Sequence, residues 1–281
     1  MSAVPTNAQG AVQDLRISLV QGDTRWHDPA GNRTYYGDLL SPLAGRTDLV
    51  VLPETFTSGF SNEAIAQAED MQGPTVAWMR QQAAQLDAAV TGSVQLREGE
   101  AVYNRLLFAT PDGEVQQYDK RHLFRYGGEH ERYAAGRERL SVQWKGWRIN
   151  PQVCYDLRFP VFCRNRYDVE RAGQLDFDLQ LFVANWPSAR AYAWKTLLRA
   201  RAIENLCFVA AVNRVGVDGN DLHYAGDSAV IDFLGQAQVE VREVEQVVTT
   251  TLSAGALAAH RARFPAMLDA DAFVLEQPTA D

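Results

Sequence analysis

Short and almost wholly apolar segments recur along the chain and alternate with segments of helical character. Residues 49–52, 179–184 and 207–212 are apolar runs of strand length. The segment 74–86 begins with a proline, which suits the first turn of a helix, and 189–206 carries apolar side chains at four-residue intervals. Strands that alternate with helices in this way predict an α/β fold in a single domain. Two sheets, or one large mixed sheet, would be covered by helices.

The same patterns predict further elements and an approximate division of the chain. Strands are expected at 15–19, 88–94, 105–110, 115–118, 140–153 (two strands around a Lys145–Gly146 turn), 227–233 and 247–252, and helices at 32–43 and from about Pro160. Residues 1–14 are expected to be a loose lead-in, and 15–253 the main domain. The tail, 254–281, shows no amphipathic helix of its own. We expect it to dock on a partner subunit or to fold over its own domain.

Charge and cysteine content argue against several classes of protein. The formal net charge of −8, without a basic block, argues against nucleic-acid binding. The longest stretch without charged side chains, 246–260, is too short and too polar to span a bilayer. The first residues lack the basic and apolar regions of a signal peptide. Three cysteines outside any C-x-x-C pair favour a reducing compartment, so we expect a cytoplasmic protein.

Cys154 stands at the centre of the stretch N-P-Q-V-C-Y-D-L-R-F-P, residues 150–160. A strand pair precedes it and Phe159–Pro160 is expected to open a helix, so Cys154 should lie where a strand ends and the chain bends. Such a bend can hold a thiol at the rim of a sheet beside the next backbone N–H, as covalent catalysis requires. The alternative is a small buried apolar side chain, which is what most free cysteines are.

Three charged residues at strand ends or in loops are further candidates. Glu54 ends an apolar strand in L-P-E-T-F, where a carboxylate is well placed for a ligand site. Lys120, in Y-D-K-R-H-L-F, could stabilise a developing oxyanion. Glu129 follows two glycines in the long polar loop 120–139, and Glu131 is its rival. Each of these side chains could instead be a solvated surface charge, and Glu54 could be a helix N-cap partner.

Together with several shorter motifs, these residues resemble the nitrilase superfamily of carbon–nitrogen hydrolases. Glu54, Lys120 and Cys154 follow the order of that superfamily's Glu–Lys–Cys triad. The similarity continues in A-N-W-P-S-A-R from residue 184, L-L-R-A-R-A-I-E-N from 197, V-N-R-V-G from 212 and G-D-S from 226. It covers residue 15 to about residue 252. The resemblance implies an α-β-β-α sandwich that associates as a homodimer or a higher homo-oligomer.

The resemblance also implies a role for each of these residues. Glu54 would be the general base that takes the proton of the Cys154 thiol, and the thiolate would attack an amide carbonyl. Lys120 and the backbone N–H of Tyr155 would stabilise the oxyanion, and the resulting thioester would be hydrolysed. Glu129 matches the second glutamate of the family, which positions the lysine, the substrate or the hydrolytic water. No metal and no organic cofactor is implied.

Other uses of the histidines and cysteines can be stated from the residues alone. His122 and His130 flank the glycine-containing loop, and a Cys–His pair is the commoner arrangement in thiol hydrolases. A zinc site made from Cys154, Cys163, His122 and His130 has no recognisable ligand spacing. Cys163, expected on a helix, and Cys207, in an apolar strand, are interpreted as structural. No nearby resolving cysteine is then left for a redox role.

Within the superfamily, L-P-E-T-F-T-S-G-F and C-Y-D-L-R-F-P are most similar to the omega-amidase branch. That branch releases ammonia from the terminal amide of small dicarboxylic acid monoamides such as 2-oxoglutaramate. Its pocket therefore needs a cation or several donors for the far carboxylate. Arg158 and Arg190 are the candidate cations, with salt bridges to acidic residues as the alternative. Tyr126 and Trp186 are candidate pocket walls.

Two further functions are weighed against this interpretation. Another branch of the superfamily, acting on nitriles, aliphatic amides or N-carbamoyl amines, would keep the same triad, so the triad does not separate these substrates. A non-catalytic binding module on the same fold is disfavoured because Glu54, Lys120 and Cys154 are all present.

Overall fold

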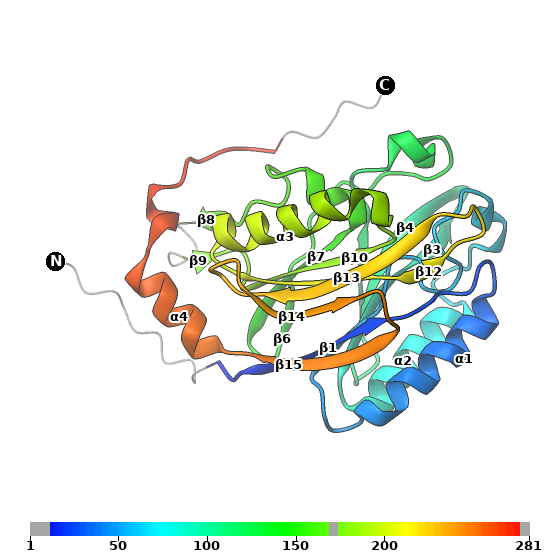
Figure 1. Cartoon of the computed structure of the whole chain (residues 1–281), viewed down its shortest axis with the longest axis horizontal. Helices are drawn as coiled ribbons and strands as arrows, with labels where there is room; N and C mark the ends of the chain where they lie inside the picture. Colours follow the sequence, from blue (N-terminus) through cyan, green and yellow to red (C-terminus); the bar gives the residue numbers. More distant parts are fainter. Residues whose placement is uncertain (1–11, 169–173, 276–281) are drawn as a thin grey trace.

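Two β-sheets pack face to face and carry helices on their outer faces in the computed structural model, which describes residues 12–168 and 174–275 (Figure 1). The first sheet has the strand order β15-β1-β2-β3-β4-β5. The second has the order β12-β13-β11-β10-β7-β6, with β14 paired to β13. Helices α1 and α2 cover the first sheet and α3 covers the second. The α-β-β-α sandwich expected from the sequence is confirmed.

The described strands and α-helices have the following bounds. The strands are β1 Leu15–Gln21, β2 Leu49–Val51, β3 Ala89–Glu98, β4 Ala101–Ala109, β5 Val115–Asp119, β6 Val142–Trp144, β7 Trp147–Val153, β8 Tyr167–Asp168, β9 Gln174–Leu175, β10 Leu179–Ala184, β11 Phe208–Asn213, β12 Val215–Val217, β13 His223–Ile231, β14 Ala237–Arg242 and β15 Gln246–Leu252. The α-helices are α1 Pro29–Leu40, α2 Pro74–Leu86, α3 Ala191–Asn205 and α4 Ala254–Arg263. The sequence patterns did not predict β8, β9, β12, β14 or α4.

The apolar strands are buried on both of their faces. Every residue of β2 and of β10 is buried, because one side of each strand faces the opposite sheet and the other side faces a helix layer. Ile17, Phe182 and Phe208 belong to one core that includes both sheets and α3, whereas Val50 and Met79 belong to the core beneath α1 and α2. This explains why the sequence is almost wholly apolar at these strands, with Gln180 the polar exception in β10.

Parallel pairing brings two important strand ends to the same edge of the molecule. β2 runs parallel to β1 and β3 in the first sheet, and β7 runs parallel to β10 in the second. Glu54 lies just after β2, and Asn185 follows the last residue of β10. The side-chain amide of Asn185 donates to the backbone carbonyl of Glu54 at 2.7 Å, so the two sheets are linked where these strands end.

The helix expected from Pro160 is absent, and that prediction is wrong. Residues 160–163 form turns, and a short 3₁₀ helix, η5 Cys154–Arg158, begins at the cysteine itself. The chain after β7 is held by long-range contacts that a local pattern does not reveal. The ring of Phe159 stacks on His122 with 3.7 Å between centroids, and the Cys163 thiol donates to the carbonyl of Asp156 at 3.2 Å. Cys163 is therefore buried in a turn and not on a helix.

The beginning of the C-terminal tail forms helix α4, which the sequence did not predict. The Ser253 side chain caps its first turn by accepting the N–H of Ala256. The helix packs on its own domain through buried Leu257 and through Arg261, which donates to the carbonyls of Leu206 and Phe177 at 2.8 and 2.9 Å. A single buried apolar residue in ten leaves only a weak amphipathic signal, which is why an alanine-rich helix was missed.

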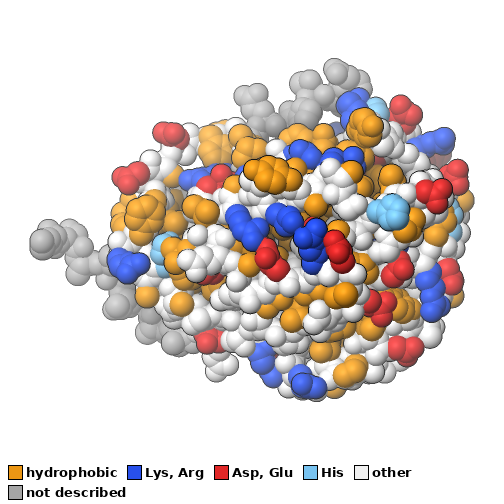
Figure 2. Space-filling view, in the orientation of Figure 1, with side chains coloured by type: hydrophobic (Ala, Val, Ile, Leu, Met, Phe, Trp, Pro, Cys, Tyr) orange, Lys and Arg blue, Asp and Glu red, His pale blue; other side chains and the backbone are white. Residues whose placement is uncertain are grey.

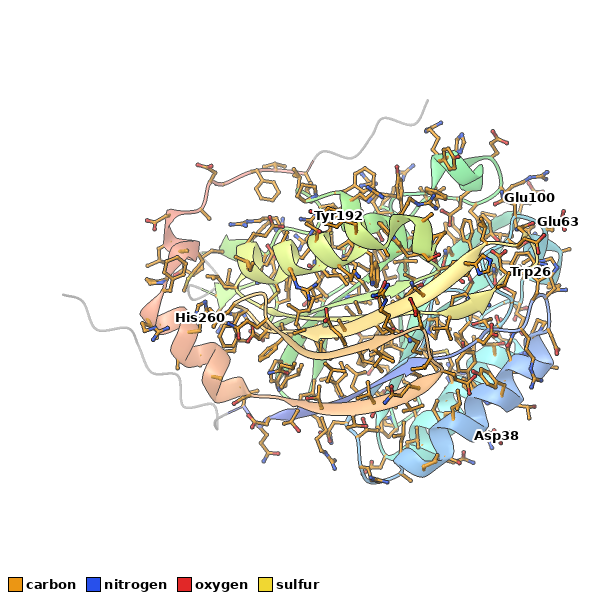
Figure 3. All side chains as sticks on the ribbon, in the orientation of Figure 1. Trp26, Asp38, Glu63, Glu100, Tyr192 and His260 are labelled. Atoms are coloured by element: carbon orange, nitrogen blue, oxygen red, sulfur yellow. The ribbon has the colours of Figure 1, made fainter. Side chains whose placement is uncertain are left out.

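The outer face of α3 carries mixed charges and some exposed apolar side chains. Figure 2 shows basic and acidic side chains next to each other on this face, with apolar side chains around them. Arg199 pairs with Glu240, and Lys195 lies 3.7 Å from Asp227. Tyr192, labelled in Figure 3, is 83% exposed. Among the residues that the structure describes, no helix has the length and apolar character needed to cross a membrane.

Candidate active site

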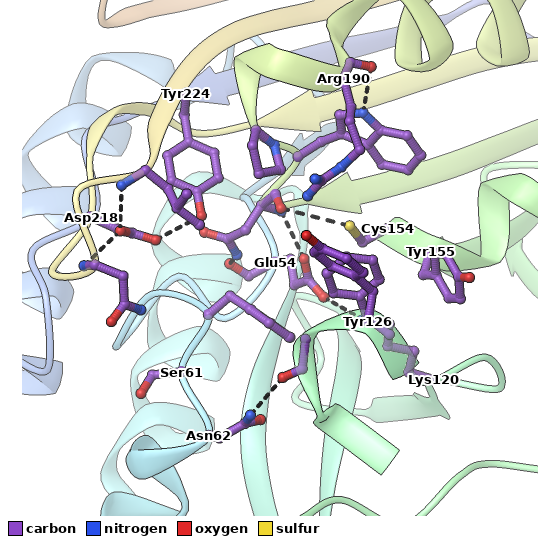
Figure 4. A pocket seen from close by; sticks show the side chains of 18 of the residues that line it. Glu54, Ser61, Asn62, Lys120, Tyr126, Cys154, Tyr155, Arg190, Asp218 and Tyr224 are labelled. Atoms are coloured by element: carbon purple, nitrogen blue, oxygen red, sulfur yellow. Dashed lines mark hydrogen bonds and ion pairs between the residues drawn. The ribbon is translucent and has the colours of Figure 1, made fainter. Parts of the chain in front are cut away.

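Glu54, Lys120 and Cys154 meet at one end of the sandwich, each just beyond a strand. Glu54 follows β2, Lys120 follows β5, and Cys154 follows β7 directly. The first two strands belong to the first sheet and β7 to the second, so the site lies where the two sheets meet. Figure 4 shows the three side chains around one cavity. The structure thus brings together residues that lie up to 100 positions apart in the sequence (154 − 54).

A buried cluster of charges forms the base of this site. The Lys120 Nζ atom lies 2.9 Å from Glu54 Oε1, and 3.0 and 2.9 Å from the two carboxylate oxygens of Glu129. All three side chains are at most 1% exposed. Burial alone would lower the pKa of Lys120, but the carboxylates of Glu129 and Glu54 raise it well above its ordinary value. The lysine therefore remains a cation inside the protein.

Glu129 is brought to Lys120 by a tight turn in the loop after β5. Gly128 adopts a φ of 70°, a conformation that favours glycine. The Glu129 carboxylate accepts the backbone N–H of Phe124 at 2.5 Å as well as the lysine. Burial and the nearby Glu54 carboxylate raise the pKa of Glu129, while Lys120 opposes this shift. The structure thus selects Glu129 over Glu131, whose side chain is exposed.

Asn104 connects the two carboxylates, and sequence reasoning missed it. Its side-chain Nδ2 lies 2.8 Å from Glu54 Oε1 and 3.2 Å from Glu129 Oε1. Its backbone carbonyl accepts the N–H of Lys120 at 3.0 Å. Asparagine is uncommon inside strands, so its presence in β4, otherwise rich in apolar residues, was the available signal.

Cys154 occupies a strained backbone position that points its thiol toward Glu54. Its φ of 44° lies in the left-handed region, which is unfavourable for a residue with a side chain. The Sγ atom lies 3.9 Å from the carbonyl oxygen of Asn185, whose own N–H donates to Glu54 Oε2 at 2.7 Å. Burial and the negative charge of Glu54 raise the pKa of the Cys154 thiol well above its ordinary value. At neutral pH the thiol is therefore protonated, and a base must remove its proton when it reacts.

The backbone N–H of Tyr155 lies in the first turn of the 3₁₀ helix that begins at Cys154. The first N–H groups of a helix have no partner within that helix and are available to an anion. The Tyr155 ring packs edge to face against Phe124 and Phe159, with centroid distances of 5.1 Å to each. These contacts fix the residue that follows Cys154.

A cavity of about 310 Å³ opens above Cys154. Its lining includes the sequence-predicted residues Glu54, Lys120, Cys154, Tyr155, Tyr126, Arg158, Trp186 and Arg190. Trp186 is buried, whereas Tyr126 is 87% exposed and stands at the rim. Further residues complete the wall: Phe60, Ser61, Asn62, Asp218, Asn220, Leu222 and, from β13, Tyr224. The cavity is large enough for a small carboxylic acid amide.

Arg158 and Arg190 are held by aromatic rings and not by carboxylates. The Arg158 guanidinium lies over the ring of Trp186 at 4.8 Å, and that of Arg190 lies over Phe124 at 5.4 Å. Trp186 in turn donates its indole N–H to the carbonyl of Arg190 at 2.9 Å. Neither arginine forms an ion pair with any residue in the described part of the chain, which is contrary to the salt-bridge alternative. Both guanidinium groups can therefore bind an anion in the cavity.

The histidines and the other cysteines lie outside the cavity lining. His122 directs its Nδ1 to Asp156 at 2.8 Å, and His130 Nε2 lies 3.9 Å from Glu131. Cys163 and Cys207 are free and fully buried. Across residues 12–168 and 174–275, no group of three or more His, Cys, Asp or Glu side chains could hold a metal ion. The geometry supports Glu54, not a histidine, as the partner of Cys154.

Comparison with known proteins identifies the family. Residues 16–262 match the carbon–nitrogen hydrolase family. The chain is 48% identical over 263 residues to omega-amidase YafV of Yersinia enterocolitica, covering 93% of this chain and 98% of that one. It is 33% identical over 235 residues to 2-oxoglutaramate amidase of Bacillus subtilis, covering 83% and 88%.

A solved structure is closer still. The crystal structure of a CN-hydrolase superfamily protein from Xanthomonas campestris, which carries an arsenic adduct in its active site, is 84% identical. The two chains superpose with a TM-score of 0.93, over 94% of this chain and 99% of that one. The resemblance drawn from the motifs is confirmed: the chain belongs to the carbon–nitrogen hydrolase family, within the nitrilase superfamily.

Proposed function

We propose that this protein is a cysteine-dependent omega-amidase that hydrolyses the terminal amide of small dicarboxylic acid monoamides such as 2-oxoglutaramate. One arrangement supports this proposal above all. A thiol with a buried carboxylate and a buried lysine beside it shares a cavity with two arginines that have no ion-pair partner among the described residues. The first group can open an amide, and the second can hold a carboxylate at the other end of the substrate.

The geometry supports a two-stage reaction. In the first stage Glu54 takes the proton of Cys154, and the thiolate attacks the amide carbonyl carbon. The Lys120 ammonium and the N–H of Tyr155 stabilise the oxyanion of the tetrahedral intermediate. The C–N bond then breaks, and the proton held by Glu54 goes to the leaving nitrogen, so ammonia departs and a thioester remains.

The second stage returns the enzyme to its starting state. Water attacks the thioester carbonyl while Glu54 takes one of its protons, and the same donors stabilise the new oxyanion. Collapse of this intermediate breaks the C–S bond and releases the carboxylic acid, and the proton returns from Glu54 to the sulfur of Cys154. Glu129 holds Lys120 in place through both stages. No step in this sequence uses a metal or an organic cofactor.

The substrate's distant carboxylate is proposed to bind Arg158 and Arg190. Their guanidinium groups lie over the aromatic rings of Trp186 and Phe124, which keeps them extended and limits the entropy that they would lose on binding an anion. Tyr126 at the rim is placed to cover a bound substrate, and Trp186 forms an apolar part of the wall.

The first experiment measures ammonia release by the wild type and by Cys154→Ala. The substrates are 2-oxoglutaramate, succinamate, a neutral aliphatic amide, a nitrile and an N-carbamoyl amino acid. We expect release from the two carboxylated monoamides that is lost in Cys154→Ala. Cysteine-dependent turnover of a different substrate alone would favour another branch of the superfamily. Ammonia release that persists in Cys154→Ala would contradict the mechanism.

A second experiment tests the two arginines. In Arg158→Ala and Arg190→Ala, KM for carboxylated monoamides should rise about 10- to 100-fold, the effect of losing a charged hydrogen bond. KM for neutral amides should change little. Arg132→Ala is the matched control, because Arg132 is exposed on the neighbouring loop and does not line the cavity. Equal losses on carboxylated and neutral substrates would remove both arginines from the carboxylate site.

We also propose that the protein acts in the cytoplasm as a homodimer or higher homo-oligomer. Three free cysteines suit a reducing compartment. The exposed apolar side chains of Tyr192 and Ile203 on α3 are suited to a contact between subunits. Sedimentation as a monomer at micromolar concentration would contradict the oligomer.

A further inference from the structure

A fully buried carboxylate that the proposed reaction does not use lies directly behind Cys154. Asp156 is 0% exposed and lies two residues after the cysteine, within η5. Its Oδ2 atom accepts the N–H of Val153 at 3.0 Å and the hydroxyl of Tyr118 at 2.8 Å. Its Oδ1 atom accepts the backbone N–H of His122 at 3.0 Å and contacts the His122 ring Nδ1 at 2.8 Å.

The residues that take part in these four contacts lie before and after Lys120 in the sequence, and before and after Cys154. Tyr118 precedes Lys120 by two residues and His122 follows it by two. Val153 directly precedes Cys154, and Asp156 follows it by two residues. A single carboxylate therefore connects the segment that carries the lysine to the turn that carries the nucleophile. These segments belong to different sheets, and their residues are 34 and 38 positions apart at the contacts with Asp156.

The backbone at Cys154 needs such a restraint. Its φ of 44° is unfavourable, and a strained conformation persists only when surrounding contacts hold it. The bond from Val153 N–H to Asp156 closes the turn around the cysteine. On the lysine side, the Tyr118 hydroxyl also accepts the N–H of Arg121 at 3.2 Å, and the His122 ring stacks on Phe159. Tyr118 and His122, the side-chain partners of Asp156, are thus each fixed by a second contact.

We propose that Asp156 is a positioning residue that holds Lys120 in register with the thiol of Cys154. Asp156 acts through its contacts with the side chains of Tyr118 and His122. The proposal rests on the proposed roles of Cys154 and Lys120, and it concerns their separation. A shift of about 1 Å between an oxyanion donor and a nucleophile costs roughly 100-fold in rate. Loss of Asp156 should therefore lower kcat, while KM, set by the arginines across the cavity, changes little.

Two readouts separate positioning from simple support of the fold. The first is hydrolysis of the best amide, which needs both the thiol and the oxyanion donor. The second is reaction of Cys154 with methyl methanethiosulfonate, in which the thiolate attacks sulfur and methanesulfinate leaves, so no oxyanion forms. In Asp156→Asn we expect kcat to fall about 100-fold and the methanethiosulfonate rate to fall much less. A structural control is Asp178→Asn, which removes a largely buried charged carboxylate at the other end of the sandwich.

The contributions of Tyr118 and His122 are tested by variants that remove one contact to Asp156 each and are expected to fold. Tyr118→Phe and His122→Ala should each lower kcat about tenfold, as expected for one hydrogen bond to a charged group. The double variant should lose less than the product of the two, because both side chains act on the same carboxylate. His122→Asn should retain more activity than His122→Ala, since its amide can donate in place of the ring N–H.

Several outcomes would overturn the proposal. Asp156→Asn with wild-type kcat is one, and strictly independent losses in the double-variant cycle are another. Parallel loss of hydrolysis, methanethiosulfonate reaction and folded fraction, as expected in a variant that merely unfolds, would also reject positioning. Failure of the proposed function is recognised separately, because Cys154→Ala would then retain ammonia release whatever Asp156 does.

Discussion

Two charge clusters lie at opposite ends of the sandwich, and they have opposite compositions. The candidate active site combines one lysine with two carboxylates, Lys120 with Glu54 and Glu129. At the other end, Asp178 pairs with two arginines, Arg148 on β7 at 2.6 Å and Arg261 on α4 at 2.5 Å. The first cluster has an excess of negative charge and the second an excess of positive charge.

The excess determines what each cluster can do. In the first, burial together with the surplus negative charge of Glu54 raises the pKa of the Cys154 thiol, and the Glu54 carboxylate lies beside that thiol as an acceptor for its proton. In the second, burial alone would raise the pKa of Asp178, but hydrogen bonds and charge from Arg148 and Arg261 hold it below its ordinary value. Both oxygens of the Asp178 carboxylate already accept hydrogen bonds from Arg148 or Arg261, and these bonds join β7 to α4. The same residue types therefore serve chemistry in one place and stability in the other.

Removal of the only cation from the first cluster should have the largest effect. In Lys120→Met the volume is roughly kept, but the oxyanion donor is lost and two buried carboxylates remain without a counter-charge. We expect kcat for the best amide to fall about 1000-fold or more. Steady-state ammonia release measures the loss, and the circular dichroism melting curve shows how much folded protein remains. A folded Lys120→Met enzyme with near-normal kcat would contradict the role of this cluster in catalysis.

The matching change in the second cluster should affect stability and leave activity intact. Asp178→Ala leaves two largely buried arginines without their carboxylate, which we expect to cost about 3 kcal/mol of unfolding free energy. Urea denaturation measures this loss, and kcat of the folded fraction should equal that of the wild type. A drop in kcat as large as that of Lys120→Met would show that the two clusters are not functionally distinct.

The difference in unfolding free energy between the wild type and Asp178→Ala should depend on pH. Since the pKa of Asp178 is lowered in the folded state, its contribution is complete above the pKa of an unfolded aspartate, near pH ~4. The contribution is lost as the pH falls through the folded-state pKa. The gap between wild type and Asp178→Ala should therefore be constant from pH 7 to about 5 and should narrow in stronger acid.

The last prediction concerns the thiol itself. Because the pKa of Cys154 is raised, the thiolate fraction at neutral pH is small and grows about tenfold for each pH unit. The rate of reaction with methyl methanethiosulfonate in the absence of substrate should rise continuously from pH 7 to 9, without a plateau. A plateau near neutrality would indicate a thiolate ion pair of the Cys–His type, and it would mean that the negative excess around Cys154 is compensated.

The sequence predicted the parts of the site that follow directly from strand ends. Apolar runs located β2 and β10, and a strand pair around the Lys145–Gly146 turn located β7. Glu54, Cys154 and the motif beginning at Ala184 were therefore placed at the ends of strands. Lys120 and Glu129 came from motif order, and the structure brings both to Glu54. A hydrophobic period or a sequence motif can predict where a residue lies when its important contacts are within one helix or strand, or directly next to it.

Residues that act through distant contacts could not be predicted in this way. Asn104 is 50 residues from Glu54, and Asp156 is 38 residues from Tyr118. The local sequence around each residue therefore does not indicate these hydrogen bonds. The turn at Cys154 was expected, but its 3₁₀ geometry and the missing helix at Pro160 depend on packing against His122 and Asp156. Likewise, the orientation of Arg158 follows from a tryptophan ring 28 residues away (186 − 158).

The pairing of β1 with β15 has a consequence for the order in which the protein matures. Leu15 lies opposite Leu252, so the sheet that supplies Glu54 and Lys120 is completed by a strand that leaves the ribosome late in synthesis. Contacts of such long sequence separation form late in folding. In a nascent chain that already contains Cys154 but not β15, the sheet that holds Glu54 and Lys120 is therefore incomplete. We therefore expect amide hydrolysis to begin only when almost the whole chain has been made.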